Sequence, residues 1–135
     1  MTREQQAAAT ALLERIPLFS GCTHKELERL AAASQPIAFG EGERLCTAGS
    51  DSPECYVVAE GNAKVTVGNI TVAEVGPIDV VCERGPISGR PRAATVTAQS
   101  PLVAYAISRD QLRELMMTSP TAAATMRDEL LRRYG

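Results

Sequence analysis

Between Pro36 and Gly76 the sequence consists mainly of short strand-like runs that are separated by glycines. The runs cover residues 37–39, 44–47, 55–59, 63–67 and 70–75, and glycines punctuate them at positions 40, 42, 49, 61, 68 and 76. In the run AKVTV, apolar residues alternate with Lys64 and Thr66, so one face should point inward and the other toward water. The pair Gly68-Asn69 predicts a tight hairpin turn. This pattern constrains the middle of the chain to short, turn-linked strands.

Helical patterns precede these strands. Residues 2–16 are rich in strong helix formers and place Leu12, Leu13 and Ile16 at helical spacing, and Pro17 should end this helix. After a short turn at 18–21, Thr23 and Glu26 form a predicted capping box for a second helix.

A second helical pair follows the strands. Residues 94–98 and 102–107 predict two further strands, and Ser108 should cap a helix. Pro120 then stands at the first position of a last helix that reaches Tyr134. About eight strands are therefore expected between helices at both ends.

Length and charge limit the choice of function. With 135 residues, 44% of them apolar, the chain fits one domain over 1–135, divided into N-terminal helices (1–34), the strand region (35–107) and C-terminal helices (108–135). A net charge of -2 argues against binding nucleic acid or an acidic membrane by bulk charge. Any anion recognition must be local.

Cysteine and histidine usage argues against an enzyme or a metal site. The four cysteines, at positions 22, 46, 55 and 82, form no C-x-x-C pair, and His24 is the single histidine. Neither a zinc site nor a nucleophile–histidine pair is expected, and no cofactor is implied. Without an apolar run of about 18 residues or a secretory signal, we expect a cytoplasmic chain with reduced thiols.

Residues 76–98, GPIDVVCERGPISGRPRAATVTA, have the composition of an anion site. They place one acid, Glu83, and three arginines, at 84, 90 and 92, in a loop rich in glycine and proline between two strand-like runs. A planar guanidinium is suited to a phosphate, and a carboxylate to a hydroxyl donor.

Three stretches of the chain carry a recognisable pattern: IPLFSGCTHKELERLA at 16–31, the framework Gly42-Glu43, Gly49, Tyr56 and Gly61, and a cassette with Asp79, Glu83 and Pro91-Arg92-Ala93-Ala94-Thr95. In these stretches the chain resembles the cyclic-nucleotide-binding domain family, of the catabolite activator and protein kinase A regulatory-subunit type, and the cassette residues match that family's pattern without a gap. The resemblance implies a mainly β fold with flanking helices: an eight-stranded antiparallel jelly-roll β-barrel with N-terminal helices and two C-terminal helices.

The resemblance also implies a set of ligand-binding residues. Arg92 would bind the cyclic phosphate, Glu83 would accept the ribose 2′-hydroxyl, and the amides of Gly85 and Ala93 would complete the phosphate cradle. The full set is Cys82, Glu83, Arg84, Gly85, Arg92, Ala93, Ala94 and Thr95. Other interpretations are an ion pair between Glu83 and Arg84 or Arg92, surface roles for Arg84 and Arg90, and either a reactive thiol or a plain small residue at Cys82.

Four positions depart from the family pattern. Ile78 and Cys82 replace glycines, and Gly85-Pro86 replaces a small-then-apolar pair. A side chain at position 82 costs about 1–2 kcal/mol if the backbone there needs a positive φ, or about tenfold in affinity. Pro86 disfavours the short helix that orients the phosphate-binding amides. We therefore expect weakened binding.

Two functional hypotheses remain. The first is a regulatory sensor in which cAMP or cGMP binding repositions the C-terminal helices, with a separate effector protein and a homodimer formed through Met126, Leu130 and Leu131. Tyr134 could stack on the base. The alternative is a degenerate fold that acts as a ligand-independent protein-interaction module.

Overall fold

The computed structural model describes residues 1–49, 54–81 and 94–134. The helices are α1 (Arg3–Glu14), the 3-10 helix η1 (Pro17–Phe19), α2 (His24–Ala33), α4 (Arg109–Thr118) and α5 (Pro120–Tyr134). The strands are β1 (Gln35–Phe39), β2 (Arg44–Cys46), β3 (Glu54–Glu60), β4 (Ala63–Val67), β5 (Ile70–Val75), β6 (Val80–Val81), β7 (Thr95–Ala98) and β8 (Leu102–Ser108).

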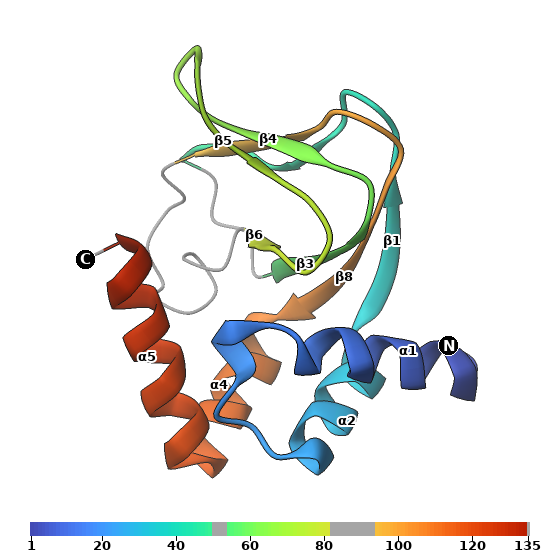
Figure 1. The fold of residues 1–135 in the computed structure, drawn as a ribbon, viewed down its shortest axis with the longest axis vertical. Helices are drawn as coiled ribbons and strands as arrows, with labels where there is room; N and C mark the ends of the chain where they lie inside the picture. The colour runs from blue at the N-terminus through green and yellow to red at the C-terminus, as the bar shows by residue number, and fades with distance from the viewer. Residues whose placement is uncertain (50–53, 82–93, 135) are drawn as a thin grey trace.

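The strands form two four-stranded antiparallel sheets. The first has the order β1-β8-β3-β6 and the second the order β2-β7-β4-β5. The N-terminal helices and α4 gather beneath the strands, and α5 rises along one side (Figure 1). The predicted fold class, a mainly β jelly roll with flanking helices, is confirmed. Only the two-residue strand β6 was not assigned a range from the sequence, because Val80-Val81 is too short to show a period.

Side-chain caps fix where the helices begin. The Thr23 hydroxyl accepts from the Glu26 amide at 3.2 Å, and the Glu26 carboxylate accepts from the Thr23 amide at 2.8 Å. Ser108 and Gln111 form the same reciprocal pair at the start of α4. Both predicted caps are confirmed. Helix α1, predicted to reach Ile16, ends at Glu14 because the chain turns there into the 3-10 helix that begins at Pro17.

Two clusters of buried apolar side chains divide the molecule. The helix-side cluster joins the helices to one face of the first sheet, and the barrel interior lies between the two sheets. Strand β3 contributes to both, since Cys55 and Val57 belong to the helix-side cluster and Tyr56 and Val58 to the barrel interior. Period-two alternation on a strand buried on both faces produces this division.

Glycines allow the turns between strands. Gly42, Gly49, Gly61 and Gly68 have positive φ, which supports the predicted glycine framework. At Gly61 a Cβ atom would lie 2.3 Å from the Pro101 carbonyl oxygen, so the turn before β4 packs on the turn before β8. Gly68, between the paired residues Val67 and Ile70, stands at the first central position of the predicted hairpin turn, as type II′ requires.

Strand β8 runs into helix α4 without an intervening loop. Ser108 is the last residue of β8 and also the N-cap of α4. One turn later, the Gln111 side-chain amide donates to the Ala33 carbonyl at the end of α2, at 2.7 Å. The two helices beneath the first sheet are therefore tied to each other and directly to its strands.

Candidate functional site

Most of the predicted ligand-binding residues lie outside the described residues. These are Cys82, Glu83, Arg84, Gly85, Arg92 and Ala93, together with Pro86 and the question of the cassette helix. The structure describes Ala94 and Thr95, and it describes Asp79, which matches the family pattern at the start of the cassette. The site can therefore be built from the two chain segments that enter and leave residues 82–93.

The entering segment is a turn closed by Asp79. The Asp79 amide donates to the Gly76 carbonyl at 3.1 Å, and the Asp79 carboxylate accepts from the Gly76 amide at 2.8 Å. The turn is fixed to β3 by bonds from the Ile78 amide to the Val58 carbonyl and from the Val58 amide to the Asp79 carbonyl, both 2.9 Å. Asp79 therefore has a structural role here, in which its carboxylate holds the chain that leads into the cassette.

Ile78 adopts a backbone conformation that β-branched residues rarely adopt. Its φ is 70°, and the turn has Pro77 at its second position and Ile78 at its third. A type II turn requires a positive φ at the third position, where glycine is the usual residue. The departure noted in the sequence is thus a side chain held in the left-handed region, which costs about 1–2 kcal/mol. Half-buried packing of Ile78 on the helix-side cluster opposes that cost.

The leaving segment is anchored by Thr95. Its hydroxyl oxygen accepts from the Ala48 amide at 3.0 Å, and its carbonyl accepts from the Thr66 hydroxyl at 3.5 Å. Thr95 also pairs with Thr66 in the β4–β7 ladder. Ala94 precedes it at the end of the cassette and is half-buried. This anchor fixes the position at which the Pro-Arg-Ala-Ala-Thr motif joins the second sheet.

Small side chains line much of the barrel interior beside these anchors. Four of its buried residues are alanines, at positions 63, 98, 104 and 106. Phe39 and Tyr56 form an edge-to-face pair there, with ring centroids 5.6 Å apart. Tyr56, which belongs to the family framework noted in the sequence, is thereby packed within the barrel interior.

The cysteines require a correction. All four were expected to be reduced, but Cys46 in β2 is disulfide-bonded, whereas Cys22 and Cys55 are reduced. The expectation rested on an assumed compartment and took no account of which thiols the fold brings together, which sequence spacing does not show. Cys82, the remaining cysteine, lies outside the described residues. Burial, followed by the nearby Glu26 carboxylate, raises the pKa of Cys22 to about 11.

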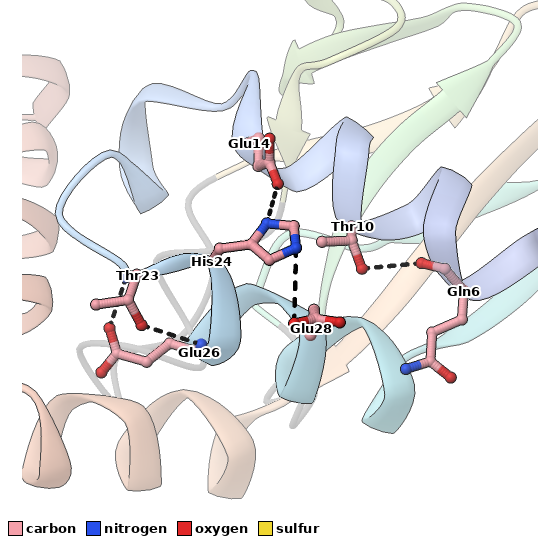
Figure 2. A network of polar contacts seen from close by, with 7 residues as sticks. All are labelled: Gln6, Thr10, Glu14, Thr23, His24, Glu26 and Glu28. Atoms are coloured by element: carbon pink, nitrogen blue, oxygen red, sulfur yellow. Dashed lines mark hydrogen bonds and ion pairs between the residues drawn. The ribbon is translucent and has the colours of Figure 1, made fainter. Parts of the chain in front are cut away.

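His24 joins the first two helices and does not belong to the candidate site. Figure 2 shows its ring between two carboxylates, with Nδ1 2.5 Å from Glu14 Oε1 on α1 and Nε2 3.6 Å from Glu28 Oε1 on α2. The side chain is exposed at the first residue of α2. The adjacent cap acts on Glu26, whose pKa is lowered chiefly by the Thr23 backbone amide.

The described residues contain no metal-binding cluster that would compete with the cassette as a candidate site. Within 1–49, 54–81 and 94–134, no three histidine, cysteine or carboxylate side chains are placed to hold a metal ion. In the same ranges no helix combines the length and apolar character needed to cross a membrane. A groove between α2 and α4, lined in part by Arg29, Gln111 and Leu115, contains none of the predicted ligand-binding residues.

The jelly roll and the two anchored ends of the cassette motif agree with the architecture that the resemblance implied. A family model for the cyclic nucleotide-binding domain matches residues 36–119, so the chain belongs to the cyclic nucleotide-binding domain family. The mouse cyclic nucleotide-gated channel alpha-4 is 28% identical over 125 residues, covering 87% of this chain and 22% of the channel.

Solved structures agree on the fold. The regulatory subunit of a cAMP-independent protein kinase A from Trypanosoma cruzi, bound to guanosine, superposes with a TM-score of 0.82 at 25% identity, covering 87% of this chain and 42% of that one. The Thermus thermophilus catabolite activator protein gives 0.76 at 24% identity, with 87% and 57% covered. The chain therefore spans about a fifth of the channel's length and less than half of the kinase subunit's.

Proposed function

We propose that this chain is a cyclic-nucleotide sensor of the cAMP type whose affinity is reduced by the substitutions in its cassette. The observation that carries the proposal is the gapless motif from Asp79 to Thr95, whose two ends are fixed by hydrogen bonds, Asp79 to Val58 of β3 and Thr95 to Thr66 of β4. In this proposal Arg92 binds the phosphate, Glu83 binds the ribose hydroxyl, and the amides of Gly85 and Ala93 complete the cradle. Cys82, Arg84, Ala94 and Thr95 line the same site.

The output of the sensor is a change in the position of the C-terminal helices. Helix α5 packs closely on the N-terminal segment, since a Cβ atom at Gly21 would lie 2.4 Å from Thr125 Oγ1 and 2.8 Å from the Thr121 carbonyl oxygen. Any shift of α5 must therefore also move the residues around Gly21. We propose that residues 1–135 act as one cytoplasmic regulatory domain without enzymatic activity, which passes this movement to a separate effector protein.

The C-terminal helices are also the proposed site of homodimerisation, but the described side chains of α5 offer little exposed apolar surface. Met126 is fully buried in the helix-side cluster, and Leu130 packs against that cluster. Leu131 remains, with 67% of its surface exposed. A dimer through α5 would therefore depend on a narrow contact.

Calorimetric titration tests the proposal. Cyclic AMP and cyclic GMP should bind weakly, and Arg92→Ala should abolish binding because a charge-assisted bond to phosphate contributes about 1.5–3 kcal/mol. Arg113→Ala, on the exposed side of α4, is the matched control and should bind as the parent does. Retention of affinity in Arg92→Ala would place the ligand elsewhere.

The double variant Cys82→Gly/Pro86→Leu tests the cause of the weakness. It should bind at least about tenfold more tightly than Cys46→Ala, which removes the disulfide of Cys46 alone, because both changes restore the family pattern. Unchanged affinity would show that these departures do not limit binding. Guanosine is a useful further ligand, because the kinase subunit from Trypanosoma cruzi was solved with it and it carries no phosphate.

The second candidate function is a ligand-independent interaction module. The isoleucine held at φ 70° in a glycine position favours it, because this side chain departs from the family pattern at the entrance to the cassette. The absence of heat and of any thermal shift at millimolar cAMP, cGMP and guanosine would support this module and exclude the sensor.

A further inference from the structure

The four edges of the two sheets differ in how they are protected. Strand β1 contains Pro36, β2 has three residues and an irregular register, and β6 has two residues. Strand β5 has six residues, no proline and no lysine, and its outer side pairs with no strand in the described part of the chain. Strand β5 also contains a register irregularity, as β2 does, but it is the longest of the four edges and has neither proline nor lysine, and such an edge is the most open to pairing with another chain.

The same edge carries exposed apolar side chains. Of the six large hydrophobic residues that are exposed in the described residues, three belong to the β4–β5 hairpin: Val67 at 48%, Ile70 at 69% and Val72 at 57%. In Figure 1 this hairpin projects beyond the rest of the second sheet. Concentrated apolar exposure on a projecting edge is typical of an interaction surface.

A bulge in β5 makes this edge complementary to itself. Ile70 pairs with Val67 and Val75 with Ala63, and the register shifts by one residue between these pairs. Val67 and Ala63 share a face of β4, so Ile70 and Val75 share a face of β5 although five positions separate them. By the same argument Thr71 and Glu74, the partners of Thr66 and Lys64, share the other face.

We propose that β5 pairs with β5 of a second copy of this chain, antiparallel about a two-fold axis between Val72 and Ala73. This register places Ile70 opposite the second copy's Val75 and Val72 opposite its Ala73. Thr71 then lies opposite the second copy's Glu74, so the only charged residue of β5 faces a hydroxyl donor instead of a second carboxylate. The β2-β7-β4-β5 sheets of the two copies then form one continuous eight-stranded sheet. Two-fold symmetry limits the assembly to a dimer, because each copy uses its only β5 edge. This proposal does not depend on nucleotide binding.

Sedimentation of the parent chain from about 1 µM to about 1 mM tests the pairing, because weak protein pairs form in this range. We expect a concentration-dependent dimer whose dissociation constant rises at least about tenfold in Ile70→Lys/Val72→Lys, since charges on an edge oppose pairing. Ala38→Lys, at an exposed position of the β1 edge, is the matched control and should dimerise as the parent does. A chain that stays monomeric throughout, or a dimer that resists the β5 variant and is lost in Leu131→Lys, overturns the proposal.

Cross-linking tests the register independently. Mild oxidation of an equimolar mixture of Thr71→Cys and Glu74→Cys chains should give a covalent dimer containing both variants. A mixture of Thr71→Cys with Ala38→Cys should not give one. A dimer in solution without the first cross-link would overturn the proposed register.

Discussion

The helix-side cluster and the barrel interior are both buried but are built from side chains of different size. Among the ten largest fully buried side chains, only Leu102 and Val58 belong to the barrel interior, and the other eight to the helix-side cluster. Strand β8 shows the division within one segment, because Ala104 and Ala106 face the interior while Ile107 packs among the helices. Large side chains therefore fill the helix-side cluster, and small ones fill much of the barrel interior beside the cassette.

The largest loss of stability should come from truncating a large side chain of the helix-side cluster. Phe19→Ala removes a side chain that is 1% exposed, and we expect the free energy of unfolding to fall by about 3–5 kcal/mol. Val96→Ala in the barrel interior removes two methyl groups and should cost about 1–2 kcal/mol. Urea unfolding of both variants measures the difference. Equal losses would mean that the two clusters contribute alike.

The turns of the barrel should respond according to how closely they are packed. Gly61→Ala combines a positive φ with a Cβ atom 2.3 Å from the Pro101 carbonyl oxygen, and should cost about 3 kcal/mol. Gly68→Ala has the same backbone problem but no atom within 4 Å of its Cβ, and should cost about 1 kcal/mol. Thermal unfolding compares the two. If Gly68→Ala were the more damaging change, contact with Pro101 would not be the decisive factor.

The turn that leads into the cassette should show a reversed preference for glycine. At an ordinary position, alanine is more stable than glycine by about 0.5–1 kcal/mol. At Ile78, with φ 70°, Ile78→Gly should instead be more stable than Ile78→Ala by about 1 kcal/mol, because both lose the same packing and only alanine keeps the strain. Denaturation midpoints of the two variants test this order. The usual order would show that the turn is unstrained.

The last prediction concerns the Cys22 thiol at the edge of the helix-side cluster. With a pKa of about 11, Cys22 should react with iodoacetamide at pH 8 about a hundredfold more slowly in the folded than in the unfolded chain, as peptide mass spectrometry can follow. The folded chain holds this proton more tightly, so the free energy of unfolding should fall as the pH rises from about 9 to 11. Cys22→Ala should lose less stability over that interval. Equal rates in the two states would contradict this protection.

Local signals in the sequence predicted most of the fold. The caps at Thr23 and Ser108, the start of the last helix at Pro120 and the hairpin at Gly68-Asn69 depend on neighbouring residues, and all were predicted correctly. Features that depend on distant contacts were missed. The bulge in β5 and the disulfide of Cys46 arise from pairing between segments that sequence spacing does not reveal. The positive φ of Ile78 is local to the turn at residues 76–79, but a β-branched residue gives no signal for that conformation.

The candidate site could be predicted only as a motif. The family pattern identified Asp79 and Thr95, and the structure shows how each is anchored. The family pattern alone could not show that the Asp79 carboxylate closes its own turn, because that bond requires the particular geometry of residues 76–79. The ligand-binding roles of Glu83 and Arg92 stay predictions.

The shared residue Ser108 has a consequence for how this domain tolerates change. Because it ends β8 and caps α4, the rotational phase of the helix is set directly by the pleat of the strand. Each residue of an α-helix turns the chain by about 100°, so one residue inserted after Ser108 would direct Leu112 and Leu115 away from the core. At this junction we therefore expect substitutions to be tolerated far better than insertions or deletions, because only a change in length rotates the helix relative to the strand.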